Sequence, residues 1–152
     1  IKDNFAIEGN PTLFERVILN LVVNAVEELH FLQKEKRKEI VISSMIKGKS
    51  VKINIKDNGN GIKLEDLPNI FNSNFSSKSS KGNLGLGLPF VKESIAKKFN
   101  GDIQVSSKEG KYTQFEITFP LVLEENLNQH EKQNIQNQRL FRPNTQGYSL
   151  SM

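Results

Sequence analysis

Apolar and polar positions along the chain predict two main helices. Residues 13–32 are apolar over most of their length, so we expect a long helix buried on nearly all sides, with Pro11 near its first turn and Thr12 helping to cap it. The amphipathic pattern of residues 88–99 predicts a second helix, and the Asn-Gly pair that follows favours a helix end there.

Four runs with the periodicity of strands complete the predicted fold. Residues 40–46 are β-rich and residues 51–55 alternate apolar with polar side chains, so the two should form a hairpin. Residues 103–105 and 115–119 repeat this alternation and should form a second hairpin. The order helix, hairpin, loop, helix, hairpin predicts an α+β fold, a two-layer α/β sandwich with the helices on one face of a mixed, mostly antiparallel sheet.

Composition changes near the end of the chain. Ten of the 29 residues from 124 to 152 are Asn or Gln, and apolar residues are sparse there. We therefore expect residues 1–122 to form one domain and residues 123–152 to be a polar, disordered tail. A docking role for Leu140-Phe141 is the alternative for this tail.

Bulk composition narrows the function classes. The 36% hydrophobic content suits one compact core, and because the chain begins at Ile1 rather than Met we expect it to be cut from a larger protein. No apolar run approaches the ~18 residues needed to span a membrane, and no secretory signal is visible. The absence of cysteine fits a reducing compartment, so we expect a cytoplasmic location. A net charge of +4, with lysines scattered among glutamates, argues against nucleic-acid or membrane contact.

Two asparagines stand out in the first predicted helix. Asn20 and Asn24 are four residues apart, so they share one face of an otherwise apolar helix. Buried amides need hydrogen-bond partners, and Asn oxygens are hard neutral ligands suited to Mg²⁺. The alternative is that both amides bond to backbone or to each other, and the helix alone favours that alternative.

A second unusual segment follows the strand at residues 51–55. Asp57 at a strand end can accept a hydrogen bond from an exocyclic amine such as adenine N6. Gly59 and Gly61 let the backbone approach a flat ring, against which Ile62 can pack. The alternative is a common Asp-Asn-Gly turn, which this segment alone favours.

The third segment is rich in glycine and opens the second helix. Glycines at 82, 85 and 87 precede that helix, and the free N–H groups of a helix N-terminus favour a phosphate. Lys78 and Lys81 add positive charge, although a flexible glycine loop is the alternative. In this order and at these spacings, the three segments describe a pocket for a purine nucleotide and its metal-bound phosphates.

These segments resemble the catalytic ATP-binding domain of sensor histidine kinases, within the superfamily shared with gyrase-type topoisomerases, a heat-shock chaperone family and mismatch-repair ATPases. The resemblance covers roughly residues 5–121, and it is specific because several boxes agree in order and spacing. The matching segments are the N box at residues 19–25, the G1 box at 57–62, the F box at 70–75, a Ser-Ser-Lys at 76–78 and the G2 box at 85–88.

The resemblance implies a Bergerat-type ATP-binding fold that holds ATP with Mg²⁺ as cofactor. Asn24 would coordinate Mg²⁺, with Asn20 near the phosphates. Asp57 would accept the hydrogen bond of adenine N6, while Gly59 and Gly61 shape the adenine wall. The ATP-binding residues implied in this way are Asn20, Asn24, Asp57, Gly59, Gly61, Ile62, Phe71, Phe75, Lys78, Gly85, Leu86, Gly87 and Leu88.

The resemblance also implies a lid over the nucleotide. A short helical piece is expected at residues 64–71, followed by a serine-rich loop over residues 72–84. Phe71 and Phe75 would anchor this loop, which would order on binding. Lys78 and the backbone of the G2 box would hold the phosphates.

The function implied is transfer of the γ-phosphoryl group of ATP to a histidine on a separate helical phosphoacceptor domain, with a response regulator downstream. No residue of this chain is an obvious catalytic acid or base, and the chain's contribution would be positioning and charge neutralisation. His30 ends a helix and His130 lies in the tail, so neither fits the acceptor.

Three positions depart from the family pattern and keep alternatives open. Glu27 stands where many relatives have a basic residue, Asn83 replaces a glycine of the G2 box, and Asn10 replaces an aspartate. Glu27 and Asn83 suggest one alternative, a non-catalytic nucleotide-sensing pseudokinase. The other alternative is an anti-sigma-type serine kinase with the same pocket.

Overall fold

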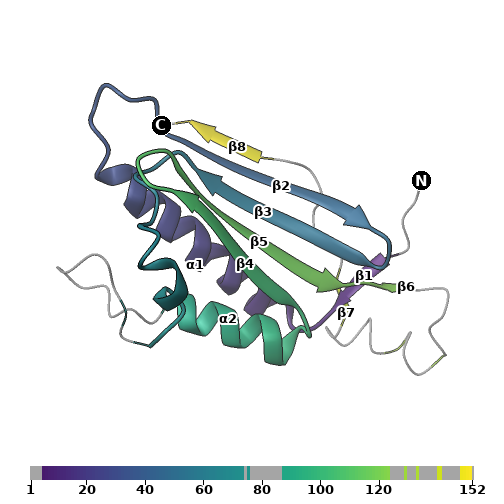
Figure 1. Cartoon of the computed structure of the whole chain (residues 1–152). Helices are drawn as coiled ribbons and strands as arrows, with labels where there is room; N and C mark the ends of the chain where they lie inside the picture. Colours follow the sequence, from purple (N-terminus) through teal and green to yellow (C-terminus); the bar gives the residue numbers. More distant parts are fainter. Residues whose placement is uncertain are drawn as a thin grey trace.

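The computed structural model has two helices that cover one face of an antiparallel sheet (Figure 1). It describes residues 5–73, 75, 87–123, 129, 133, 140–141 and 148–151. Helix α1 (Pro11–His30) and helix α2 (Gly87–Lys98) contact each other, and both contact the sheet. The predicted α+β fold is therefore confirmed.

The main sheet has five strands, and its neighbouring strands are all antiparallel. Strand β3 (Ser50–Asp57) lies in the middle, between β5 (Tyr112–Pro120) and β2 (Glu39–Lys47). Strands β4 (Asp102–Lys108) and β8 (Tyr148–Ser151) form the two edges. Both predicted hairpins, β2–β3 and β4–β5, are present.

A smaller sheet and a short helix complete the described elements. The smaller sheet has the order β6 (Val122–Leu123), β1 (Phe5–Glu8) and β7 (Leu140–Phe141). A 3-10 helix, η1 (Leu67–Asn69), lies within the segment where a short helical piece is expected. Of the helices that the structure describes, none is both long and apolar enough to cross a membrane.

Alternation along β3 and β5 builds the core between the sheet and the helices. Every second residue of β5 is buried from Thr113 to Phe119, and one stripe of α1 joins the same core. Burying each large apolar side chain contributes ~1.5–3 kcal/mol. The most deeply buried large side chains are Ile7, Val17, Leu21, Leu29, Ile40, Val51, Ile55, Val91, Ile95, Phe99, Ile117 and Phe119.

Helix α1 begins at Pro11, two residues earlier than predicted, and Asn10 caps it. The Asn10 side chain accepts a hydrogen bond from the Leu13 backbone N–H at 3.1 Å. Pro11 occupies the first turn, where its missing N–H costs little. The cap is therefore Asn10 rather than Thr12, whose side chain is exposed.

The outer face of α1 is apolar but not covered. Leu19, Val23 and Val26 are 60%, 43% and 40% exposed, so the prediction that the helix is buried on nearly all sides is wrong. Asn20 and Asn24 lie on a flank of the helix, between this face and the buried stripe, and are half-buried. The helix thus presents three different surfaces.

Two short segments from the predicted tail form strands. β8 pairs with β2, and β7 pairs with β1. The ring of Phe141 in β7 lies 4.8 Å from the ring of Phe14 on α1. These two segments are strands rather than disordered chain, and a docking role for Leu140-Phe141 stays a prediction. The division of the chain after residue 122 stays a prediction.

The loop after β3 packs against the turn between β4 and β5. Gly61 has a φ of 69°, and a Cβ there would lie 2.3 Å from the backbone oxygen of Lys108. The Gly110 N–H donates to the Asn60 carbonyl at 2.6 Å, and the Ile62 N–H donates to Ser107 Oγ at 2.8 Å. Only glycine fits at position 61, for reasons of backbone packing.

We expect Asn10→Ala to lower the free energy of unfolding by about 1 kcal/mol, because it leaves the N-terminal N–H groups of α1 uncapped. Thr12→Ala serves as the matched control, since it removes a polar side chain of similar size two residues away. Urea denaturation of both variants measures the difference. Equal losses, or a larger loss for Thr12→Ala, would contradict the assignment of the cap.

A pair of glycine variants tests the packing of the loop after β3. Gly61→Ala and Gly48→Ala both place a Cβ at positive φ, but nothing lies within 4 Å of the Cβ at position 48. Gly48→Ala should therefore cost only the backbone strain, ~1–2 kcal/mol. Gly61→Ala should cost at least about 2 kcal/mol more in the same denaturation experiment, because the Lys108 backbone has to move. Similar costs would show that this contact is loose.

Candidate functional site

Helix α1 brings the two N-box asparagines to one half-buried flank. The Asn20 side-chain nitrogen donates to the Arg16 carbonyl at 2.8 Å, which leaves its Oδ1 as an acceptor. The Asn24 side chain makes no hydrogen bond with the part of the chain that the structure describes. Within the described residues, the alternative that both amides bond to backbone or to each other therefore holds only for the nitrogen of Asn20.

The start of α2 lies next to this flank. A Cβ at Gly87, the first residue of α2, would lie 3.3 Å from Asn20 Oδ1. The Arg16 guanidinium lies 4.4 Å from the ring centroid of Phe90, which ties the two helices together at this end. Leu88 is half-buried against the core. The amide oxygen of Asn20 therefore faces the N-terminal end of α2, where backbone N–H groups attract anions.

Asp57 ends the central strand and is buried. Its residue is 3% exposed, and its Oδ1 accepts a hydrogen bond from the Gly59 N–H at 2.8 Å. A Cβ at Gly59 would lie 2.7 Å from that oxygen and 3.0 Å from Glu28 Cβ of α1. The Asp-Asn-Gly turn is thus present, but a turn alone does not require a buried carboxylate, which is costly to remove from water.

Sequence reasoning missed Thr113. This residue is 3% exposed and is the β5 partner of Asp57 across the strand pair. Its Oγ1 lies 3.3 Å from Ser107 Oγ on β4. The signal was available, because Thr113 occupies the inward-facing position of an alternating strand that is otherwise filled by Phe and Ile.

Asn58 is the second residue that sequence reasoning missed. Its Oδ1 accepts from the Glu39 N–H at 2.9 Å, and its Nδ2 donates to the Arg37 carbonyl at 2.8 Å. These bonds fasten the connector between α1 and β2 to the loop that follows Asp57. No local pattern marks this role, because the partners lie about 20 residues away along the chain.

The F-box aromatics lie at the foot of the predicted lid. Phe71, Phe75 and Ile62 are half-buried and pack against the core. The Phe71 ring meets the Phe115 ring edge-on at 6.4 Å, and Lys92 Nζ lies 5.1 Å from its centroid. Three of the predicted ATP-binding residues, Lys78, Gly85 and Leu86, lie outside the described residues, as does most of the predicted lid.

The described residues fit a hard cation that takes most of its coordinating oxygens from bound phosphates rather than from the protein. The described residues contain no cluster of three His, Cys, Asp or Glu side chains able to hold a metal ion. Asn20 and Asn24 supply neutral oxygens, and Asn20 Oδ1 faces Gly87, where the lack of a Cβ leaves room. Such a set matches Mg²⁺, which takes few protein ligands and shares phosphate oxygens.

Comparisons with known proteins match this chain to one family and to sensor kinases within it. Residues 9–123 match the family described as "Histidine kinase-, DNA gyrase B-, and HSP90-like ATPase". The chain is 33% identical over 115 residues to the sensor histidine kinase ZraS of Escherichia coli K12, covering 76% of this chain and 23% of that protein. It is 31% identical over 119 residues to sporulation kinase C of Bacillus subtilis 168, covering 78% of this chain and 26% of that protein.

Solved structures agree with the sequence relatives. The nucleotide-free catalytic domain of the histidine kinase ThkA superposes with a TM-score of 0.62 at 28% identity, covering 75% of this chain and 70% of that one. The chain spans about a quarter of the length of ZraS and sporulation kinase C. The fold, the boxes and these matches establish that the chain belongs to the family of histidine kinase-, DNA gyrase B- and HSP90-like ATPases.

Proposed function

We propose that this domain binds Mg·ATP and donates the γ-phosphoryl group to a histidine on a separate helical phosphoacceptor domain. The observation that carries the proposal is the buried carboxylate of Asp57, which ends the central strand beside two glycines. A buried carboxylate can discriminate an adenine N6 amine from the O6 carbonyl of guanine, because only the amine donates a hydrogen bond.

The two ends of the proposed site take the two ends of the nucleotide. Asp57 and Gly59 receive the adenine, and the buried Thr113 hydroxyl supports the same wall. Asn20 and Asn24 face the phosphates next to the start of α2. Bound Mg²⁺ would neutralise phosphate charge, and the chain itself supplies positioning, which is most of what phosphoryl transfer asks of a protein.

Two observations support a separate acceptor domain, one from the relatives and one from the histidines of this chain. ZraS is a sensor histidine kinase, and most of its length lies outside the match. His30 is exposed at the last turn of α1, on the face of Val23 and Val26 rather than on the flank of Asn20 and Asn24. The proposed function therefore includes an acceptor histidine on another domain and a response regulator downstream. It also includes a cytoplasmic setting.

Asp57→Asn should weaken ATP binding by about 10- to 150-fold, because it exchanges a charged hydrogen bond for a mismatched amide. The preference for ATP over GTP should fall as well, since an amide N–H can donate to guanine O6. Calorimetric titration measures both effects, and Asp102→Asn, an exposed carboxylate on β4, is the charge-matched control. Circular dichroism checks that the variant folds; unchanged ATP affinity in a folded variant would rule out this adenine site.

Asn24→Ala should remove most of the effect of Mg²⁺ on ATP affinity and change metal-free binding little, because the lost group is a metal ligand. The titration is repeated with ATP in the presence and absence of Mg²⁺. An equal loss in both conditions would mean that Asn24 serves the helix or the nucleotide itself rather than the metal.

The transfer step is tested by adding the chain and radiolabelled ATP to a phosphoacceptor domain from a related sensor kinase. We expect label on the acceptor that is lost in acid, because phosphohistidine is acid-labile and phosphoserine is not. Replacement of the acceptor histidine by alanine is the control. An acid-stable product would favour the serine-kinase alternative, and binding without any transfer would favour the nucleotide sensor.

A further inference from the structure

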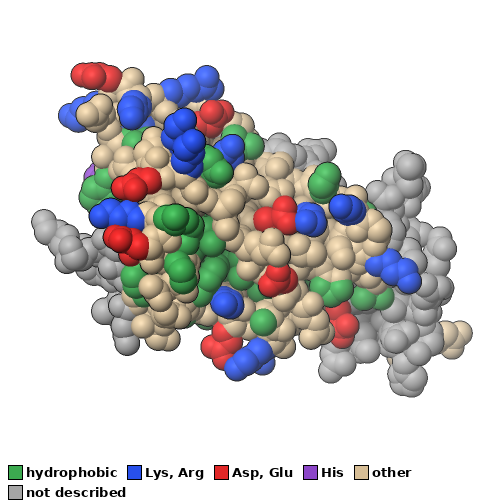
Figure 2. Space-filling model, viewed as in Figure 1, with side chains coloured by type: hydrophobic (Ala, Val, Ile, Leu, Met, Phe, Trp, Pro, Cys, Tyr) green, Lys and Arg blue, Asp and Glu red, His purple; other side chains and the backbone are tan. Residues whose placement is uncertain are grey.

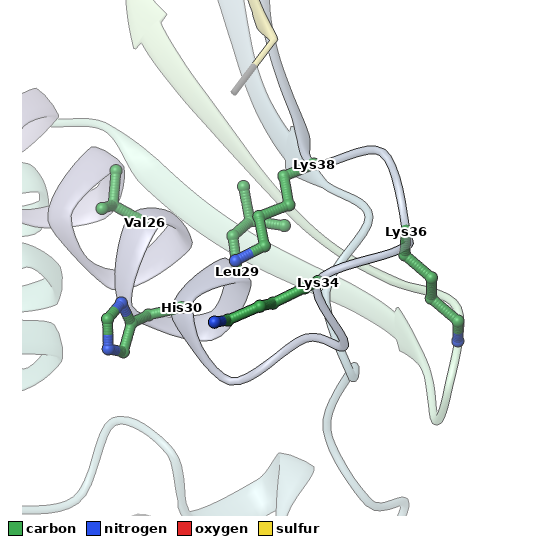
Figure 3. A pocket seen from close by; sticks show the side chains of 6 residues that line it. All are labelled: Val26, Leu29, His30, Lys34, Lys36 and Lys38. Carbon is green, nitrogen blue, oxygen red and sulfur yellow. The ribbon is translucent and has the colours of Figure 1, made fainter.

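A cationic pocket lies at the far end of α1, formed by its last turn and by the connector to β2. We call it the connector pocket, and its volume is about 360 Å³. Figure 3 shows Lys34 reaching toward His30 and Lys38 passing over Leu29, while Lys36 points away. The residues that line it are Val26, Leu29, His30, Lys34, Lys36 and Lys38.

The charge of the connector pocket comes from Lys34, Lys36 and Lys38. None of them makes an ion pair within 4.0 Å in the part of the chain that the structure describes, whereas Arg37 pairs with Glu39 at 3.9 Å. Figure 2 shows several Lys and Arg side chains, with acidic side chains among them, at the corner where Figure 1 places the connector. Like charges held together repel, so this pocket favours an anion.

Hydrogen bonds hold the backbone around the connector pocket in place. Asn58 bonds to the connector at Arg37 and Glu39, as described above. The Arg37 side chain donates to Ser151 Oγ of β8 at 3.1 Å, and the Lys36 N–H donates to the Gln33 carbonyl at 3.1 Å. A ligand therefore meets a preformed shape, which lowers the entropic cost of binding.

An uncovered apolar stripe leads into the connector pocket. It consists of Leu19, Val23 and Val26, which are four and three residues apart and so form one row on the outer face of α1. The row is ~10 Å long at 1.5 Å per residue. Val26 belongs to both the stripe and the pocket, so the two form one continuous surface.

We propose that this surface docks an amphipathic helix of a partner protein, whose acidic residues enter the connector pocket and whose apolar residues cover the stripe. A row of apolar residues spaced three and four apart is the surface that a helix face fits. Charge complementarity with the lysines of the pocket sets the orientation of that helix and favours its association.

The same surface fits other anionic partners less well. A nucleic-acid backbone would gain nothing from the apolar stripe, and it would need basic residues along an extended track. An anionic membrane would meet the exposed carboxylate of Glu15 on the same side of α1. A protein helix accommodates both the apolar row and the single cationic end.

The test uses this chain without nucleotide, so its outcome is independent of ATP binding. The probe is a synthetic helical peptide of about 18 residues, with Leu at helical spacing and Glu in its last two turns. Its control has Lys in place of every Glu. We expect the acidic peptide to shift the ¹⁵N amide resonances of residues 19–38 in NMR spectra, and the shifts to weaken with salt.

Variants assign the binding to the proposed surface. The double variant Lys34→Glu with Lys38→Glu should weaken binding at least about tenfold, and Val23→Ser should weaken it severalfold. The double variant Lys63→Glu with Lys111→Glu makes the same charge change at exposed lysines elsewhere and should leave the affinity close to wild type. All these positions except Lys38 are exposed, so the fold should tolerate the changes.

Three results would overturn the proposal. One is that the acidic and lysine peptides bind equally or not at all. Another is that reversing the two pairs of lysines has the same effect. The third is that a DNA oligonucleotide or phosphatidylserine vesicles, but not the peptide, perturb residues 19–38, which would assign the surface to nucleic acid or membrane instead.

Discussion

The burial of the Asp57 carboxylate is the constraint on which the candidate site depends. A carboxylate at 3% exposure is tolerated only if its oxygens find donors, and the Gly59 N–H is one of them. Asp57 can be buried because β3 lies in the middle of the sheet, with β2 and β5 on either side and α1 above it. The same helix carries Asn20, whose Oδ1 lies next to the start of α2, so one packing arrangement positions both ends of the proposed site.

Much of this arrangement was predictable from the sequence. The alternation of β3 and β5 indicates their buried faces, and the four-residue spacing of Asn20 and Asn24 indicates their shared flank. Thr113 and Asn58 were missed for different reasons. The alternating pattern of β5 already marks Thr113 as a polar residue that faces inward. The partners of Asn58, in contrast, are brought close only by the tertiary fold.

Errors in the prediction came from what local patterns leave open. The apolar length of α1 indicates a helix but not which elements cover it, and its outer stripe is exposed because the sheet and α2 lie on other sides. Segments as short as β7 and β8 carry little periodicity. The polar residues around them therefore led to the prediction of a disordered tail.

A crystal structure of this chain with Mg²⁺ and a non-hydrolysable ATP analogue tests the central claim most directly. We expect adenine N6 within hydrogen-bond distance of the Asp57 carboxylate, beside Gly59, and phosphates next to Asn20, Asn24 and the start of α2. A nucleotide bound elsewhere, or an adenine ring with no contact to Asp57, would contradict it. In that case the burial of this carboxylate would need a purely structural explanation.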